Sequence, residues 1–144
     1  MMQEIIASSI LIFAATLSYF VRRRKPDAPS QTSRTVPQQL SREDFVSAEK
    51  PWLLAVFTSS TCDACQDVSA KAKVLTSSDV AVQIVEFQEM SDLHERYSID
   101  AVPTTVIADQ LGVVRYGVLG PVTATDLWAA MARCRDPKSS TELC

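Results

Sequence analysis

Two cysteines separated by two residues, Cys62 and Cys65, are the part of this sequence best suited to chemistry. They follow an apolar run at 52–57 and a short polar stretch at 58–61, and a helix-like segment comes after them. Cysteines with this spacing at the start of a helix can close a small disulfide and reopen it. The helix N-terminus favours the thiolate, which is the form that attacks a disulfide. The motif therefore indicates exchange chemistry between thiols and disulfides.

A second informative stretch, Ala101 to Thr105, reads AVPTT and leads into another apolar run. The CxxC motif, the apolar run before it and the stretch from Tyr97 to Thr104 together resemble the thioredoxin family, with the last stretch matching its cis-proline loop. Residues 106–115 resemble the hairpin of that family, and Gly120 stands where the family has a glycine after its last strand. The resemblance covers roughly residues 40–135, which is most of the chain after its first 39 residues.

The resemblance implies a role for each residue of the site. Cys62 should be the more exposed cysteine and attack a substrate disulfide, and Cys65 should then resolve the mixed disulfide. Pro103, in the cis form, would place the backbone of Val102 opposite the cysteines, where it can pair with an extended substrate segment. The implied partners are protein disulfides and an upstream thiol electron donor. The redox-active Cys62–Cys65 disulfide is the expected redox group, and no other cofactor is expected.

The sequence departs from the thioredoxin pattern around the cysteines. Thr61 stands where the family has tryptophan, and Val56 aligns with its buried aspartate, so the expected proton acceptor for the second cysteine is missing. Glu86 on the next strand is one substitute, although an exposed acid at the end of a strand is the favoured interpretation. Asp63 places a negative charge beside Cys62 and should raise the pKa of that thiol, which makes the pair more reducing. We therefore expect a reductase rather than an oxidant.

Local patterns predict the elements that position these residues. Ser41 has the features of a helix N-cap, and the helix it begins should end before Pro51. The helix after the CxxC should bury one face, made of Cys65, Val68, Ala72 and Leu75. Strands are expected at 52–58, 80–87, 104–108 and 113–118, and further helices at 90–97 and about 125–133. The order αβαβαββα predicts an α/β thioredoxin fold, a central mixed sheet flanked by helices.

The N-terminal segment has the composition of a membrane anchor. Residues 5–21 carry no charge, and at about 1.5 Å per residue the segment 1–21 spans about 32 Å, enough to cross a bilayer core. Four basic residues follow at 22–25, on the side opposite to that of a secretory signal peptide. They predict a single-pass protein with its catalytic domain facing the cytoplasm. This arrangement loosely resembles the membrane-tethered thioredoxin-like proteins of actinobacteria.

The remaining segments complete the predicted organisation. Residues 22–39 form a basic flank and a flexible linker rich in Pro, Ser, Gln and Thr, residues 40–136 form the thioredoxin-like domain, and residues 137–144 form a tail. Taking Glu4 and the four basic residues at 22–25 from the 17 acidic and 14 basic residues of the chain leaves 16 and 10, a net charge of −6. This charge argues against nucleic acid as a partner.

The other candidate residues carry weaker signals. Cys134 shares a helix face with Leu127 and is expected in the core, while Cys144 ends the chain. A zinc site that joins both to the CxxC pair lacks a tight second ligand spacing, so no metal site is expected. His94, the single histidine, is expected on a solvated helix face, which leaves copper chemistry without support. The tryptophans, Trp52 and Trp128, are expected to be core or packing residues.

Three functions fit these patterns. The leading hypothesis is a membrane-tethered thiol–disulfide oxidoreductase that reduces protein disulfides by exchange at Cys62 and Cys65. The second is a thioredoxin-fold binding module with little turnover, which the residues Val56 and Thr61 suggest. The third is an exchange protein that acts outside the cytoplasm, which requires the opposite membrane orientation.

Overall fold

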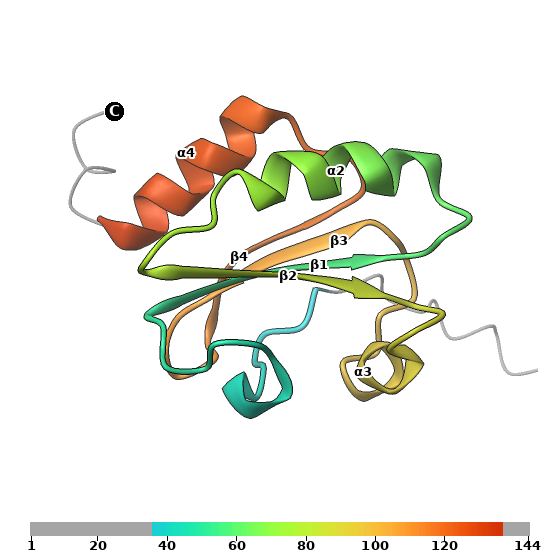
Figure 1. Cartoon of the computed structure of the whole chain (residues 1–144), viewed down its shortest axis with the longest axis horizontal. Coiled ribbons are helices and arrows are strands. Elements are labelled where there is room, and N and C mark those ends of the chain that lie inside the picture. The colour runs from blue at the N-terminus through green and yellow to red at the C-terminus, as the bar shows by residue number, and fades with distance from the viewer. Residues whose placement is uncertain (1–35, 137–144) are drawn as a thin grey trace, which may run out of the picture. The chain divides into compact units, whose positions relative to one another are not determined.

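The computed structural model describes residues 36–136, which build a four-stranded mixed sheet with helices on both faces (Figure 1). The elements follow in the order η1 (Arg42–Asp44), β1 (Trp52–Thr58), α2 (Asp63–Lys73), β2 (Val80–Glu86), α3 (Ser91–Arg96), β3 (Thr104–Ala108), β4 (Val114–Leu119) and α4 (Ala124–Arg135). The strand order in the sheet is β2-β1-β3-β4. β1 runs parallel to β2 and antiparallel to β3, and β4 is antiparallel to β3. The predicted mixed sheet is thus confirmed.

β1 lies in the centre of the sheet and is buried from its second residue onward. Side chains alternate between the two faces of a strand, and here both faces are covered. α2 and α4 cover one face, and η1 and α3 cover the other (Figure 1). Leu54 and Val56 pack under the first pair of helices, while Leu53, Ala55 and Phe57 pack on the opposite side. A strand buried on both faces explains why its sequence is a continuous apolar run.

α2 begins directly at the CxxC motif, with Cys62 as its N-cap residue. The helix buries Cys65, Val68 and Ala72, and the residues between them are exposed or half-buried. This is the apolar stripe that the 3.6-residue helical period predicts. Leu75, the fourth predicted member of that face, lies just beyond the helix end and packs partly buried against the same core.

The predicted helix after Ser41 is wrong, because only the three-residue 3-10 helix η1 forms there. The Ser41 side chain makes no capping hydrogen bond. The next residue, Arg42, is 7% exposed, and its guanidinium donates to the carbonyl oxygens of Lys50 and Asp109, each at 3.1 Å, and of Ser47 at 3.3 Å. These bonds satisfy two carbonyls of the loop that follows η1 and one just after β3, and no α-helix forms in this loop.

Asp44, at the end of η1, connects this loop to α3. Its carboxylate accepts hydrogen bonds from the Tyr97 hydroxyl and from Arg96. The bond from Tyr97, followed by those from Arg96, lowers the pKa of the Asp44 carboxyl. Because the ionised form is the one that is bound, this contact stabilises the fold only where Asp44 is deprotonated.

Residues 36–39, which the sequence places in the linker, lie beside β4. The amide of Val114 donates to the carbonyl oxygen of Gln38 at 3.0 Å, and Val36 packs partly buried against the core. Within residues 36–136 no helix is long and apolar enough to cross a membrane. The predicted anchor at 1–21, most of the predicted linker and the tail at 137–144 lie outside the described residues.

Candidate active site

The two cysteines of the CxxC motif are joined by a disulfide, with the sulfur atoms 2.12 Å apart and the Cα atoms 5.4 Å apart. Cys62 is half-buried and Cys65 is 2% exposed, which confirms that the first cysteine is the more accessible one. The amide of Cys65 donates to the Cys62 carbonyl at 3.2 Å, within the first turn of α2. Of the two cysteines, Cys62 is therefore the one more open to solvent.

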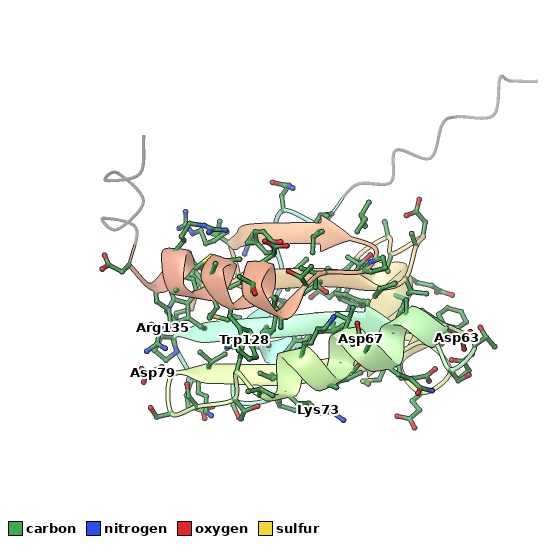
Figure 2. The ribbon with its side chains drawn as sticks, turned by 90° about the horizontal axis from the view of Figure 1, so that it is seen from above. Asp63, Asp67, Lys73, Asp79, Trp128 and Arg135 are labelled. Atoms are coloured by element: carbon green, nitrogen blue, oxygen red, sulfur yellow. A yellow bond between two sulfur atoms is a disulfide. The ribbon has the colours of Figure 1, made fainter. Side chains whose placement is uncertain are left out.

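Asp63 supplies the only charged side chain in the first turn of α2. It is exposed and lies at the N-terminal end of the helix (Figure 2). The N-terminus of a helix carries a partial positive charge that favours anions, so Asp63 competes with a Cys62 thiolate for the same electrostatic stabilisation. The position of Asp63 fits the effect on Cys62 that the sequence predicts, and that effect remains a prediction.

A network of hydrogen bonds fixes the loop that precedes the cysteines. The Ser60 amide donates to the Glu86 carboxylate at 2.6 Å and to the Gln88 side-chain oxygen at 3.2 Å. The Gln88 amide nitrogen donates to the Ser59 hydroxyl at 3.2 Å, and this hydroxyl lies 3.1 Å from that of Thr61. Glu86 and Gln88, at and just after the end of β2, therefore fix the loop that precedes Cys62. Sequence reasoning missed this role of Gln88 and Ser59, because no local pattern connects the two segments.

The floor beneath α2 is apolar at the position where an acid would be expected. Val56 is fully buried, pairs with Ile84 on β2 and lies opposite Thr105 on β3. Residues that face each other across a sheet place their side chains on the same face, so these three form one row under α2. Thr105 is fully buried, and its hydroxyl has no hydrogen-bond partner among the described residues. The row contains a hydroxyl but no carboxylate.

Glu86 is the acid that shares a cavity with the second cysteine. A cavity of about 370 Å³ is lined by both Cys65 and Glu86, together with Lys73 and residues of α2. Glu86 ends β2, is half-buried, and accepts the amides of Ser60 and Glu89. Its place at the strand end agrees with the favoured interpretation of the sequence, but the side chain is anchored rather than freely exposed.

The loop before β3 contains the predicted cis-proline, Pro103. The peptide bond between Val102 and Pro103 is cis, as predicted. Thr104 pairs with Phe57, the next-to-last residue of β1, so the loop lies beside the segment that leads to Cys62. The Thr104 hydroxyl donates to the Ala101 carbonyl at 2.7 Å, and the Gly120 amide donates to the Pro103 carbonyl at 2.7 Å. Both bonds hold the loop in place.

The prediction that His94 lies on a solvated helix face is wrong. His94 is 3% exposed, and its Nε2–H donates to the carbonyl oxygen of Val85 at 2.9 Å. Its ring packs edge-on against Phe57 and Phe87, at centroid distances of 5.2 and 5.3 Å. The carbonyl of Val85 lies on the side of β2 that pairs with β1, so the His94 ring is a donor to this carbonyl in addition to the strand pairing. The same ring lines a cavity of about 190 Å³ next to Val102.

Three other predicted residues lie away from the cysteines. Cys134 packs against the core as predicted, but it is only partly buried and also lines a cavity. Trp52 is partly buried against the core, which confirms a packing role. Trp128 is 43% exposed and so is not a core residue, although its indole N–H donates to the Lys71 carbonyl at 3.3 Å and joins α4 to α2 (Figure 2). Cys144 lies outside the described residues.

Comparisons with known proteins support the fold. No protein-family model and no curated protein matches the chain. Among solved structures it is similar to a variant thioredoxin from Halobacterium salinarum, with 26% identity over 65% of this chain and 88% of that chain and a TM-score of 0.52. It is also similar to Fasciola hepatica thioredoxin, with 21% identity, 63% and 88% of the chains covered and a TM-score of 0.54. A third is the germline-specific thioredoxin Deadhead from Drosophila melanogaster, at 24% identity, 60% and 83% coverage and a TM-score of 0.52.

Residues 36–136 thus have a thioredoxin-like α/β fold, as the sequence predicts. The bonded Cys62–Cys65 pair occupies the start of α2 in this fold. The fold likeness and the cysteine pair together support thiol–disulfide exchange as the chemistry of the site.

Proposed function

We propose that this chain is a thiol–disulfide oxidoreductase that reduces disulfides of protein substrates. The observation that carries the proposal is the Cys62–Cys65 disulfide at the N-terminus of α2, with one accessible and one buried cysteine. A helix N-terminus favours a thiolate, and a second thiol one helical turn away can close the ring again. The pair itself carries the two electrons, so the reaction requires no further cofactor.

The proposed reaction has two exchange steps. The Cys62 thiolate attacks one sulfur of the substrate disulfide, a mixed disulfide forms, and the other substrate sulfur leaves as a thiolate that takes up a proton. Cys65 then loses its proton and attacks the sulfur of Cys62, which releases the second substrate thiol and restores the Cys62–Cys65 disulfide. The substrate gains two electrons and two protons. An upstream thiol donor then reduces the Cys62–Cys65 disulfide back to two thiols by the same kind of exchange.

We assign the binding of the substrate backbone to the loop at Val102 and Pro103. The pairing of Thr104 with Phe57 puts this loop beside the segment that leads to the cysteines, and Val102 is only partly buried. An extended substrate segment can form main-chain hydrogen bonds there without a strong demand on its side chains. The cavity that Val102 shares with Phe87 and His94 offers space for one apolar substrate side chain.

Two parts of the proposal rest on the sequence: that the protein reduces its substrates, and that it does so on the cytoplasmic side of the membrane. Asp63 opposes the helix dipole at Cys62, and a less stabilised thiolate makes the pair a stronger reductant. We further propose that residues 1–21 tether the protein to the cell membrane and that the basic residues at 22–25 keep the catalytic domain in the cytoplasm.

Reduction of insulin by the full chain, with dithiothreitol as the electron source, tests the activity. We expect turnover by the unmodified protein and by Cys134→Ser, and none above background by Cys62→Ser. Cys65→Ser should accumulate a mixed disulfide with the substrate, because the resolving thiol is absent. If Cys62→Ser reduces insulin as fast as the unmodified protein, the assigned site is wrong.

A thioredoxin-fold binding module with little turnover is the second candidate, and the apolar row at Val56 and Ile84 favours it. Under this alternative the unmodified protein forms mixed disulfides with substrates but releases them no faster than Cys65→Ser does. The release rate of a trapped substrate therefore separates the two functions. An exchange protein outside the cytoplasm is the third, and protease access to residues 26–144 in membrane vesicles of known orientation distinguishes it.

A further inference from the structure

A cavity of about 660 Å³ lies beside α4 and is separate from the cysteine pair. We call it the α4 cavity and define it by two aromatic rings, three arginines and a thiol: Trp52, Tyr116, Arg115, Arg133, Arg135 and Cys134. Trp52 begins β1, whereas Cys62 follows its end. With about 3.3 Å per strand residue, the two ends of β1 are about 20 Å apart.

Three arginines and one carboxylate, that of Asp109, line the α4 cavity, so the lining carries an excess of positive charge. Arg115 binds Asp109 at 2.7 Å, and Arg135 binds Asp79 at 3.0 Å, where Figure 2 shows the two side chains together. No ion pair or hydrogen bond of Arg133 is found within residues 36–136. Guanidinium groups match carboxylates in a planar, two-pronged geometry, so the cavity suits a carboxylate-bearing guest.

Cys134 adds a reactive group to this wall. It is the only free cysteine among the described residues and is partly exposed. Burial raises the pKa of its thiol, while Arg133 and Arg115 act in the opposite direction by favouring the thiolate. A thiol recessed in a cavity of this size admits a small molecule more readily than a folded protein, and the aromatic rings offer apolar walls for its body.

We propose that the α4 cavity binds small, carboxylate-bearing disulfides and that Cys134 forms a mixed disulfide with them. Cys134 loses its proton to solvent, and its sulfur attacks one sulfur of the small disulfide. The bond between the two guest sulfurs breaks, one half remains bound to Cys134, and the other half leaves as a thiolate. The Cys134 sulfur is oxidised, and the departing half is reduced. This modification site does not depend on the proposed function of the Cys62–Cys65 pair.

The test uses the full chain with Cys62, Cys65 and Cys144 each replaced by serine, so that Cys134 is the only thiol. Rate constants are measured with dithiobis-nitrobenzoate, an aromatic disulfide with two carboxylates, and with neutral dithiodipyridine. The rate constant for the anionic reagent is divided by that for the neutral reagent, and this ratio is compared between the folded chain and the same chain unfolded in urea. Mass spectrometry after treatment with oxidised glutathione then shows whether one glutathione is added.

We expect the folded chain to show a ratio at least about threefold above that of the unfolded chain, the effect of one nearby charge at the surface of a protein. Arg133→Gln should lower the ratio by about threefold, and added salt should lower it too. Lys73→Gln, which removes a charge from α2 outside the α4 cavity, should leave it unchanged. Equal ratios in the folded and unfolded chains, a ratio insensitive to Arg133→Gln, or a folded chain inert to both reagents would each overturn the proposal.

Discussion

The burial of His94 predicts a large loss of stability when its ring is removed. In His94→Ala the Val85 carbonyl loses the hydrogen bond from the ring but keeps its pairing with β1, and one such hydrogen bond contributes about 0.5–1.5 kcal/mol. The two edge-on contacts with Phe57 and Phe87 disappear as well, and each such pair contributes about 0.5–1.5 kcal/mol. We therefore expect the free energy of unfolding to fall by about 3 kcal/mol.

A second substitution separates these contributions. His94→Phe keeps a ring between Phe57 and Phe87 but removes the donor to Val85, so the loss should be about 1 kcal/mol, between that of the alanine variant and zero. Glu95→Ala, at an exposed neighbour on the same helix, serves as the control and should change stability by less than about 0.5 kcal/mol.

Urea unfolding of the full-length variants, followed by tryptophan fluorescence, measures these free energies. Trp52 lies against the core and Trp128 between α4 and α2, so both report on the described part of the chain. Should His94→Ala match the stability of Glu95→Ala, the ring would have to lie on a solvated face, and the packing argument would be refuted.

Three further substitutions test charges near the site and in the core. Asp63→Asn should lower the pKa of Cys62 and make the pair less reducing, measured by thiol alkylation against pH and by equilibration with dithiothreitol. The contacts of Asp44 contribute stability above the unfolded carboxyl pKa of about 3.9, and this stability is lost as pH falls through the lower folded pKa. In Asp44→Asn the free energy of unfolding should therefore depend less steeply on pH in the acid range than in the unmodified protein. Val56→Asp puts an acid beside the unpaired Thr105 hydroxyl. Burial should raise the folded pKa of this acid, so its destabilisation should grow as pH rises above about 4, by about 1.4 kcal/mol per pH unit up to that pKa.

The strands and the cysteine pair could be predicted because their signals are local. β1 and β3 have the predicted bounds, since each is a buried apolar run bordered by a proline or a polar stretch. The start of α2 follows from the CxxC motif, and its buried face follows from the helical period. β4 begins and ends one residue later than predicted.

The residues that were misplaced depend on contacts between distant segments. α3 has six residues and buries the adjacent pair Leu93 and His94, which no helical stripe predicts. Ser41 has the local features of an N-cap, but the buried guanidinium of Arg42 binds the carbonyl of Asp109, 67 residues away, and no helix forms. Hydrogen bonds of this range leave no periodic pattern in the sequence.

The row beneath α2 constrains how the second exchange step can occur. Cys65 must lose a proton before it attacks Cys62, and Val56 and Ile84 offer no acceptor. The hydroxyl of Thr105 can donate a hydrogen bond to a thiolate but is not a base at neutral pH. A carboxylate does line the cavity that Cys65 shares with Glu86, and it also holds the loop before Cys62. In the proposed mechanism, a proton that leaves by this route enters the hydrogen-bond network that positions Cys62, and we therefore predict that a substitution of Glu86 affects both steps.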